Sequence, residues 1–84
     1  MNSNSEITVI VQSGRGSVEL TLPPQTKVQQ VISLATQELG YPPNGQYVLV
    51  RQLTNEELDP NRPLVSYQIE DGEILILSEI GSGV

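Results

Sequence analysis

Residues 26–40 have the sequence TKVQQVISLATQELG, which contains the start, the apolar stripe and the end of one helix. Thr26 and Gln29 have the spacing of a capping box, so Thr26 is the expected N-cap residue. Gly40 stands where a residue in the left-handed conformation commonly follows a helix, which places the helix end at Leu39. Between these ends, apolar residues recur at helical spacing: Val28, Val31, Ile32, Ala35 and Leu39.

Short apolar segments on both sides of this helix predict a sheet. They are rich in β-branched residues or alternate with polar ones, and they cover residues 7–12, 18–22, 46–52 and 74–77. Leu58 is the single apolar residue of a further short edge strand. The order ββαββ with this edge strand predicts an α+β fold, in which a mixed sheet of four to five strands packs on one helix. We expect a flexible N-terminus over 1–6, a domain over 7–77 and a flexible tail over 78–84.

The composition excludes several classes of function. The 84 residues include no His and no Cys, so a Ser-His-Asp triad, a thiolate nucleophile and a Cys/His zinc site are all excluded. We place no catalytic residue, no metal ligand and no cofactor. The net charge of −6 disfavours binding to nucleic acid or to an anionic membrane and favours a basic partner. The lack of cysteine, of a secretory signal and of a membrane-spanning stretch predicts a cytoplasmic location.

Two predicted strands contain consecutive apolar residues, although one helix covers only one face of a sheet. Residues 74–77 are all apolar, and Leu49 lies between Val48 and Val50. With Val48 and Val50 taken as inward, the side chains left for the opposite face are Ile10, Leu49, Leu75 and Leu77. We expect these four residues to form a partly exposed patch that binds a partner. The alternative is that they are scattered surface residues without a role.

Two segments resemble ubiquitin and its relatives, the β-grasp family of ubiquitin-like protein modifiers, including bacterial ones. The segment GYPPNGQ at 40–46 is similar to the Gly-Ile-Pro-Pro-Asp-Gln-Gln segment that follows the ubiquitin helix. The segment LVSYQI at 64–69 resembles Leu-Ser-Asp-Tyr-Asn-Ile before the last ubiquitin strand. The resemblance extends from Ile7 to Gly83 and implies the ubiquitin-like β-grasp fold. It places Leu49 and Leu77 on the isoleucine and the valine of the family's recognition patch.

The resemblance also implies a role for the C-terminal residues. Gly83, or alternatively Gly81, would be the terminal glycine that is activated and joined to target proteins through an isopeptide bond. Val84 would first be removed by C-terminal processing. Glu79 falls on the family's tail arginine, and with Ile80 it would be recognised by the activating enzyme. The implied partners are an ATP-dependent activating enzyme, a conjugating enzyme, a processing or deconjugating peptidase and target proteins.

A protein modifier of this kind is a substrate of other enzymes and is not itself an enzyme. Lys27 is the only lysine, so amine-linked chains would grow through it or through the N-terminus. Two other functions stay open. A noncovalent β-grasp interaction module, similar to the small ubiquitin-like proteins of bacterial secretion systems, would dock through the sheet face and leave the tail idle. A sulfur carrier would use the terminal glycine for thiocarboxylate chemistry.

Overall fold

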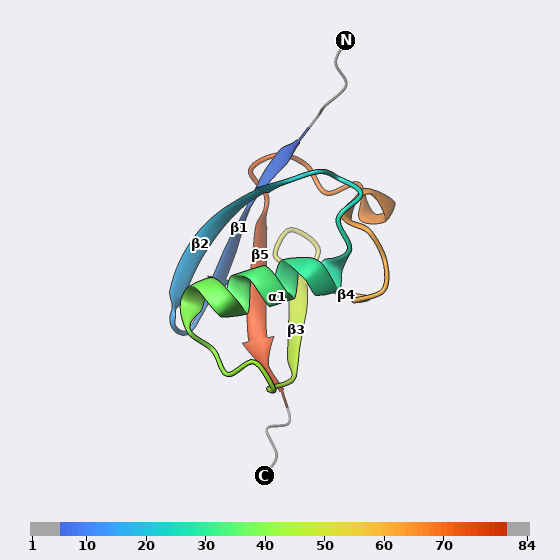
Figure 1. Ribbon diagram of the computed structural model, residues 1–84. Coiled ribbons are helices and arrows are strands. Elements are labelled where there is room, and N and C mark those ends of the chain that lie inside the picture. Colours follow the sequence, from blue (N-terminus) through green and yellow to red (C-terminus); the bar gives the residue numbers. More distant parts are fainter. Residues whose placement is uncertain (1–5, 81–84) are drawn as a thin grey trace.

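The computed structural model describes residues 6–80, in which one helix crosses a five-stranded sheet (Figure 1). The elements, in chain order, are β1 (Ile7–Ser13), β2 (Gly16–Leu22), α1 (Val28–Leu39), β3 (Tyr47–Arg51), β4 (Glu56–Leu58), the 3-10 helix η1 (Leu64–Tyr67) and β5 (Ile74–Glu79). The strand order is β2-β1-β5-β3-β4; β1 and β5 are parallel, and the other neighbours are antiparallel. The predicted ubiquitin-like β-grasp fold is therefore confirmed.

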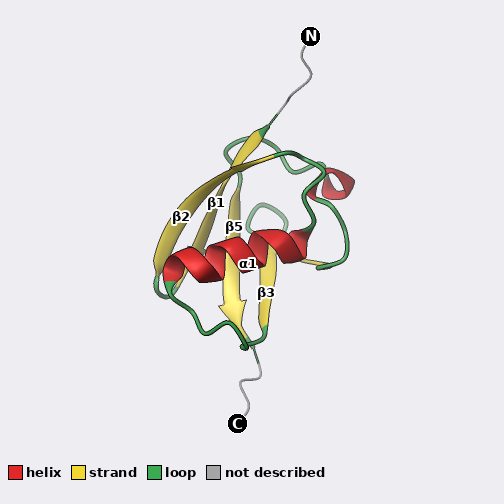
Figure 2. Cartoon of the chain, in the orientation of Figure 1, coloured by secondary structure: helices red, strands yellow, loops and turns green. Residues whose placement is uncertain are grey.

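The core lies between α1 and the face of the sheet that α1 covers (Figure 2). Every strand except β2 contributes a fully buried side chain, and the core residues are Val9, Val11, Val28, Val31, Ala35, Leu49, Leu58, Leu64, Ile69, Leu75 and Leu77. Val18 and Leu20 of β2 are half-buried and pack against this core at its edge. In the part of the chain that is described, no helix is long and apolar enough to cross a membrane.

The start of α1 differs from the prediction. The N-cap residue is Lys27, which makes no side-chain capping hydrogen bond, so the predicted capping box at Thr26 is wrong. The loop before η1 supplies the acceptors instead. The N–H of Val28 donates to the carbonyl oxygen of Arg62 at 2.9 Å, and that of Gln29 donates to Pro60 at 3.0 Å. A loop distant in sequence thus satisfies helix N–H groups that a capping side chain would otherwise serve. At the other end, Gly40 adopts the predicted left-handed conformation, with φ of 79°.

Strand β5 continues beyond its predicted end at Leu77. Ser78 pairs with Val48 and Glu79 pairs with Tyr47, and the N–H of Ile80 donates to the carbonyl oxygen of Gln46 at 2.8 Å. Ser78 and Glu79 therefore belong to the sheet and not to a flexible tail, which corrects the predicted boundary between 77 and 78. The strand extends because β3 offers it an antiparallel partner as far as Tyr47.

An ion pair closes the end of the sheet at which β3 leaves the core. The Arg51 guanidinium donates to both carboxylate oxygens of Glu73, at 2.7 and 2.6 Å, and also to the carbonyl oxygen of Tyr67 at 3.1 Å. Both side chains of the pair are mostly buried, with 13% and 12% exposed. The hydrogen bonds from Arg51 hold the pKa of Glu73 below its usual value. Folding therefore favours the ionised form of Glu73.

We expect Glu73→Gln to lower the free energy of unfolding by about 2 kcal/mol at pH 7, because hydrogen bonds between charged groups are lost. A lowered pKa in the folded state adds stability that is present above the unfolded pKa and is lost as the pH falls through the folded pKa. The difference between the two proteins should therefore shrink below about pH 4. Urea denaturation at pH 7 and at acidic pH measures it, with exposed Glu57→Gln as the control. An equal difference at both pH values would contradict the role of the charge.

Candidate functional site

The predicted patch is not on the surface. Leu49 and Leu75 have no exposed area, and Leu77 is 3% exposed, so all three are core residues under α1. The resemblance to the family's recognition patch also implied that Leu49 and Leu77 are exposed, and this is wrong. Ile10 is half-buried, as a residue of the opposite face would be. The predicted exposure is therefore wrong for the three leucines, because side chains on β3 and β5 alternate in the opposite sense to the prediction.

An apolar patch does lie on the face of the sheet opposite α1, but other residues form it. Side chains alternate between the two faces of a strand, so the neighbours of the buried leucines face outward. The outer patch consists of the half-buried residues Ile10, Val48, Val50, Ile74 and Ile76. The strand register brings them together: Ile10 is next to Ile74 across β1 and β5, and Ile76 is opposite Val50 across β5 and β3. Side chains paired in this way are in contact distance of each other.

On β3 and β5, the apolar side chains of the two faces differ in shape, whereas on β1 the buried residues Val9 and Val11 are themselves β-branched. The buried positions of β3 and β5 are leucines, and the outer positions are valine and isoleucine. A β-branched side chain is stiff and covers the pleated backbone on which it stands, so it suits an exposed sheet surface. The outer patch is thus a continuous apolar surface on the three central strands, β1, β5 and β3.

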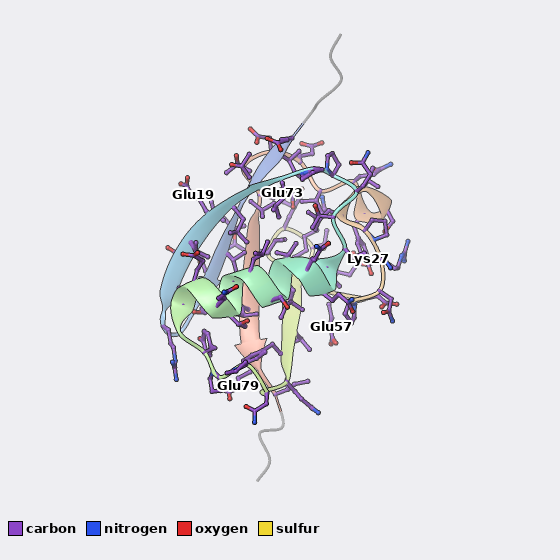
Figure 3. The ribbon with its side chains drawn as sticks, viewed as in Figure 1. Glu19, Lys27, Glu57, Glu73 and Glu79 are labelled. Carbon is purple, nitrogen blue, oxygen red and sulfur yellow. The ribbon has the colours of Figure 1, made fainter. Side chains whose placement is uncertain are left out.

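Carboxylates flank the outer patch on both sides. Glu19 of β2 pairs with Ile10, and Glu57 of β4 pairs with Val50; both glutamates are exposed. Figure 3 shows them at opposite lateral edges of the sheet. Each lies on the outer face because it is directly opposite an outer residue of the neighbouring strand. A partner that covers the patch therefore meets negative charge on both sides.

The four basic residues are all placed away from the outer face. Arg15 donates to the carbonyl oxygen of Gly40 at 2.6 Å and stacks on a tyrosine beyond the helix end. Arg62 lies 4.7 Å above the ring of Tyr67, and Arg51 is held by Glu73. Lys27 is exposed at the start of α1. Two exposed glutamates thus flank the patch, and the contacts of the arginines lie elsewhere on the chain.

The remaining predicted site residues have separate positions. Lys27 is exposed, as an attachment site would need to be. Glu79 and Ile80 are exposed at the end of β5, where Ile80 is 42% exposed. The predicted terminal glycines, Gly83 and Gly81, and the processed residue Val84 lie outside the described residues: their predicted roles stay predictions.

Sequence reasoning missed four residues of the outer patch: Val48, Val50, Ile74 and Ile76. Residues 74–77 are apolar at odd and at even positions, so alternation alone does not show which side chains of β5 face the core. A usable signal is Leu58, because the single apolar residue of a short polar strand is expected to face the core. Leu58 pairs with Leu49, and Leu49 pairs with Leu77, so one inward leucine orients all three strands.

A hollow lies away from the sheet. It has a volume of about 460 Å³ and lies between α1 and the connector to β3, where it is lined by Ser33, Thr36, Gln37, Tyr41 and Pro43. No charged side chain lines it. Among residues 6–80, no group of three or more Asp or Glu side chains is placed to hold a metal ion.

The fold, with one helix across a five-stranded mixed sheet, defines the class of ubiquitin-like β-grasp domains. Residues 6–77 match the family described as "WXG100 protein secretion system (Wss), protein YukD", and the chain belongs to this family. No curated protein matches the chain.

Solved structures agree with the class. A designed protein based on ubiquitin has a TM-score of 0.79 and 22% identity, and the match covers 93% of each chain. A protein solved in work on molecular mimicry of SUMO in DNA repair has a TM-score of 0.80 and 22% identity, with 92% of this chain and 95% of that chain covered. The ubiquitin-like domain of an Arabidopsis thaliana protein has a TM-score of 0.74 and 17% identity, with 88% and 77% covered. At these identities, the similarity shows the fold alone.

Proposed function

We propose that this protein is a noncovalent interaction module of a WXG100 protein secretion system, and that it docks through the outer patch on a larger component of that system. Membership in the YukD family supports the connection with secretion. The observation that supports docking through this face is the outer patch itself. Five half-buried valine and isoleucine side chains are contiguous on a sheet face that no element of the described chain covers. A contiguous apolar surface of this kind typically marks a binding site.

The charge around the patch defines the chemistry of the partner. Glu19 and Glu57 stand on its two sides, and the three arginines are engaged elsewhere, by Gly40, Glu73 and the ring of Tyr67. A complementary partner presents apolar residues surrounded by lysine or arginine, because like charges at the rim of an interface are unfavourable. The fit is therefore to a basic surface on a larger secretion component.

The family match favours this module over the covalent modifier, which was the first expectation from the sequence. The family description refers to a secretion system, and none of the comparisons supports conjugation or C-terminal processing. The proposed activity depends on residues of the sheet, and it requires no reaction at Gly83 or Gly81. The module acts by binding and not by catalysis.

Deletion of residues 81–84 tests whether the tail is needed. We expect the truncated protein to support secretion and to bind its partner as the full chain does, because the outer patch is unchanged. Export of the system's substrates in a strain that carries only the truncated form measures the effect. As a control, the full chain with Ile76→Lys should fail in the same assay. The covalent-modifier function would be supported instead if truncation abolished export and if mass spectrometry detected adducts of the full chain that persist in denaturant.

A further inference from the structure

Two dipeptides of this chain can react with themselves, because each combines a short amide or carboxyl side chain with a following glycine. They are Asn44-Gly45 and Asp71-Gly72. In such a pair, the backbone nitrogen of the glycine can bond to the side-chain carbonyl carbon of the preceding residue and close a succinimide ring. Glycine favours this step, because it has no Cβ to obstruct the approach and it allows more backbone conformations than other residues. The surroundings of each pair decide whether the ring forms in the folded protein.

The Asp71-Gly72 pair is held by hydrogen bonds to β1. The N–H of Thr8 donates to Oδ1 of Asp71 at 2.7 Å, and the N–H of Gly72 donates to the carbonyl oxygen of Thr8 at 2.6 Å. The two groups that would have to meet are thus both fixed by the same residue. Ring closure at Asp71 would break both hydrogen bonds, so the fold protects this pair.

The Asn44-Gly45 pair lies in the connector between α1 and β3 and is held less firmly. Asn44 is exposed, so water has access to its amide. The N–H of Gly45 donates to the carbonyl oxygen of Pro42 at 3.3 Å, which is longer than is usual for an N–H donor. The attacking nitrogen is therefore weakly held, next to an exposed amide.

The packing of Tyr47 explains why a glycine follows Asn44. A Cβ atom on Gly45 would lie 2.5 Å from Oη of Tyr47 and 2.8 Å from its Cζ. The tyrosine hydroxyl donates to the carbonyl oxygen of Pro42 at 2.6 Å, and the ring stands edge-on to that of Tyr41, with 5.4 Å between the centroids. The ring would lose these contacts if it moved aside. The fold thus requires at position 45 the residue type that makes Asn44 reactive.

The two other asparagines of the described chain are in a different position. Asn55 and Asn61 are also exposed, but Glu56 and Arg62 follow them, and the side chains of these residues obstruct the attack. The nitrogen of Arg62 is held as well, because its N–H donates to the carbonyl oxygen of Asp59 at 3.1 Å. Glu56 belongs to β4. Exposure alone therefore does not distinguish Asn44, whereas the residue that follows it does.

We propose that Asn44 is a site of spontaneous deamidation in the folded protein, with water as the co-reactant. The backbone nitrogen of Gly45 loses its proton to the solvent and bonds to Cγ of Asn44. The bond between Cγ and Nδ2 breaks, and the nitrogen leaves as ammonia. Water then opens the ring, at the backbone carbonyl to give isoaspartate or at the side-chain carbonyl to give aspartate. The whole conversion consumes one water, releases one ammonia and involves no oxidation or reduction.

Both products place a carboxylate in the connector, and isoaspartate also adds a methylene group to the main chain. The added atom lies between Pro42 and Tyr47, whose hydrogen bond spans this segment. We expect that hydrogen bond to weaken. The class of reaction that consumes isoaspartate is methyl transfer to its free carboxyl group, so residue 44 would be a substrate for such a methyltransferase. Asn44 is not part of the outer patch, and the proposal does not depend on docking through that patch.

The test is to age the full chain at mildly alkaline pH, in native buffer and in urea, and to map its peptides by mass spectrometry. Deamidation changes the mass by the difference between an amide and a carboxyl group. In native buffer, we expect residue 44 to be converted, mainly to isoaspartate, while Asn55 and Asn61 stay intact. Isoaspartate at residue 71 should form only in urea. Conversion of residue 44 only in urea, or conversion of all three asparagines at equal rates, would overturn the proposal.

A glutamine variant tests the assignment to residue 44. Asn44→Gln keeps the amide, but its ring would need one more methylene group and closes far more slowly. Aged protein can be labelled by a purified isoaspartate methyltransferase with a radioactive methyl donor. We expect Asn44→Gln to lose most of the label that aged wild type takes up, and the matched variant Asn61→Gln to keep it. Equal labelling of Asn44→Gln and wild type would contradict the proposal, and peptide mapping of the wild type decides the case if the variant does not fold.

Discussion

Replacing Leu49 with asparagine is expected to remove a large part of the stability of the fold. Leu49 has no exposed area, and it pairs with Leu58 and Leu77, which are also buried. Asparagine has a similar shape, so the loss comes from apolar burial and from an amide without partners. Together these cost about 4 kcal/mol, a large part of the roughly 5–15 kcal/mol that stabilises a small domain.

The adjacent residue provides the control for this experiment. Val50→Asn changes a half-buried side chain of the outer patch, so it should cost only about 1 kcal/mol, the range of strand propensities. Urea denaturation followed by circular dichroism measures both variants. A stable Leu49→Asn protein beside an unfolded Val50→Asn protein would show that the two faces of β3 are assigned the wrong way round.

Ile76→Lys is expected to abolish most of the binding to the secretion partner without unfolding the protein. Ile76 lies at the centre of the outer patch, between Gln12 of β1 and Val50 of β3. Lysine removes apolar contact and adds a positive charge that faces a basic partner surface. We expect a loss of about 2 kcal/mol or more, which is the effect of a hot-spot residue and corresponds to about thirtyfold in affinity.

Val65→Lys is the matched control for Ile76→Lys. Val65 is a 50% exposed apolar residue of η1, outside the outer patch. Titration of the purified partner domain with each variant gives the two affinities. Val65→Lys should bind as the wild type does, and circular dichroism should show both variants folded. An Ile76→Lys protein with unchanged affinity would exclude the outer patch as the docking surface.

Local patterns predicted the elements of this fold well. The apolar residues from Val28 to Leu39, together with Gly40, predict the helix, and α1 ends at Leu39 as they indicate. The predicted N-cap at Thr26 is wrong because the first N–H groups of α1 donate to the carbonyl oxygens of Pro60 and Arg62. Those residues are about thirty positions away, and no local pattern contains that contact.

The orientation of β3 and β5 was not predictable from alternation, because charged residues stand on the inner side at their ends. Arg51 is two positions from Leu49, and Glu79 is two positions from Leu77, so each pair shares one face of its strand. If the charged side chains are expected to face solvent, the leucines are then expected to face solvent as well. Arg51 faces inward because Glu73 neutralises it, and Glu79 lies beyond the core opposite Tyr47. The existence of an apolar patch was therefore predicted from the excess of apolar residues, but four of its five members were not.

Site-specific photocrosslinking in cells tests whether the outer patch contacts a secretion component noncovalently. A benzophenone amino acid at Val50 should give, on irradiation, one adduct with a component of the WXG100 secretion system, and the same group at Val65 should give none. The crosslinked peptide of that component should contain apolar residues with neighbouring lysine or arginine. Without irradiation, denatured samples should contain only the free chain. Adducts that persist in denaturant without light, or equal crosslinking from both positions, would contradict a module that binds noncovalently through this face.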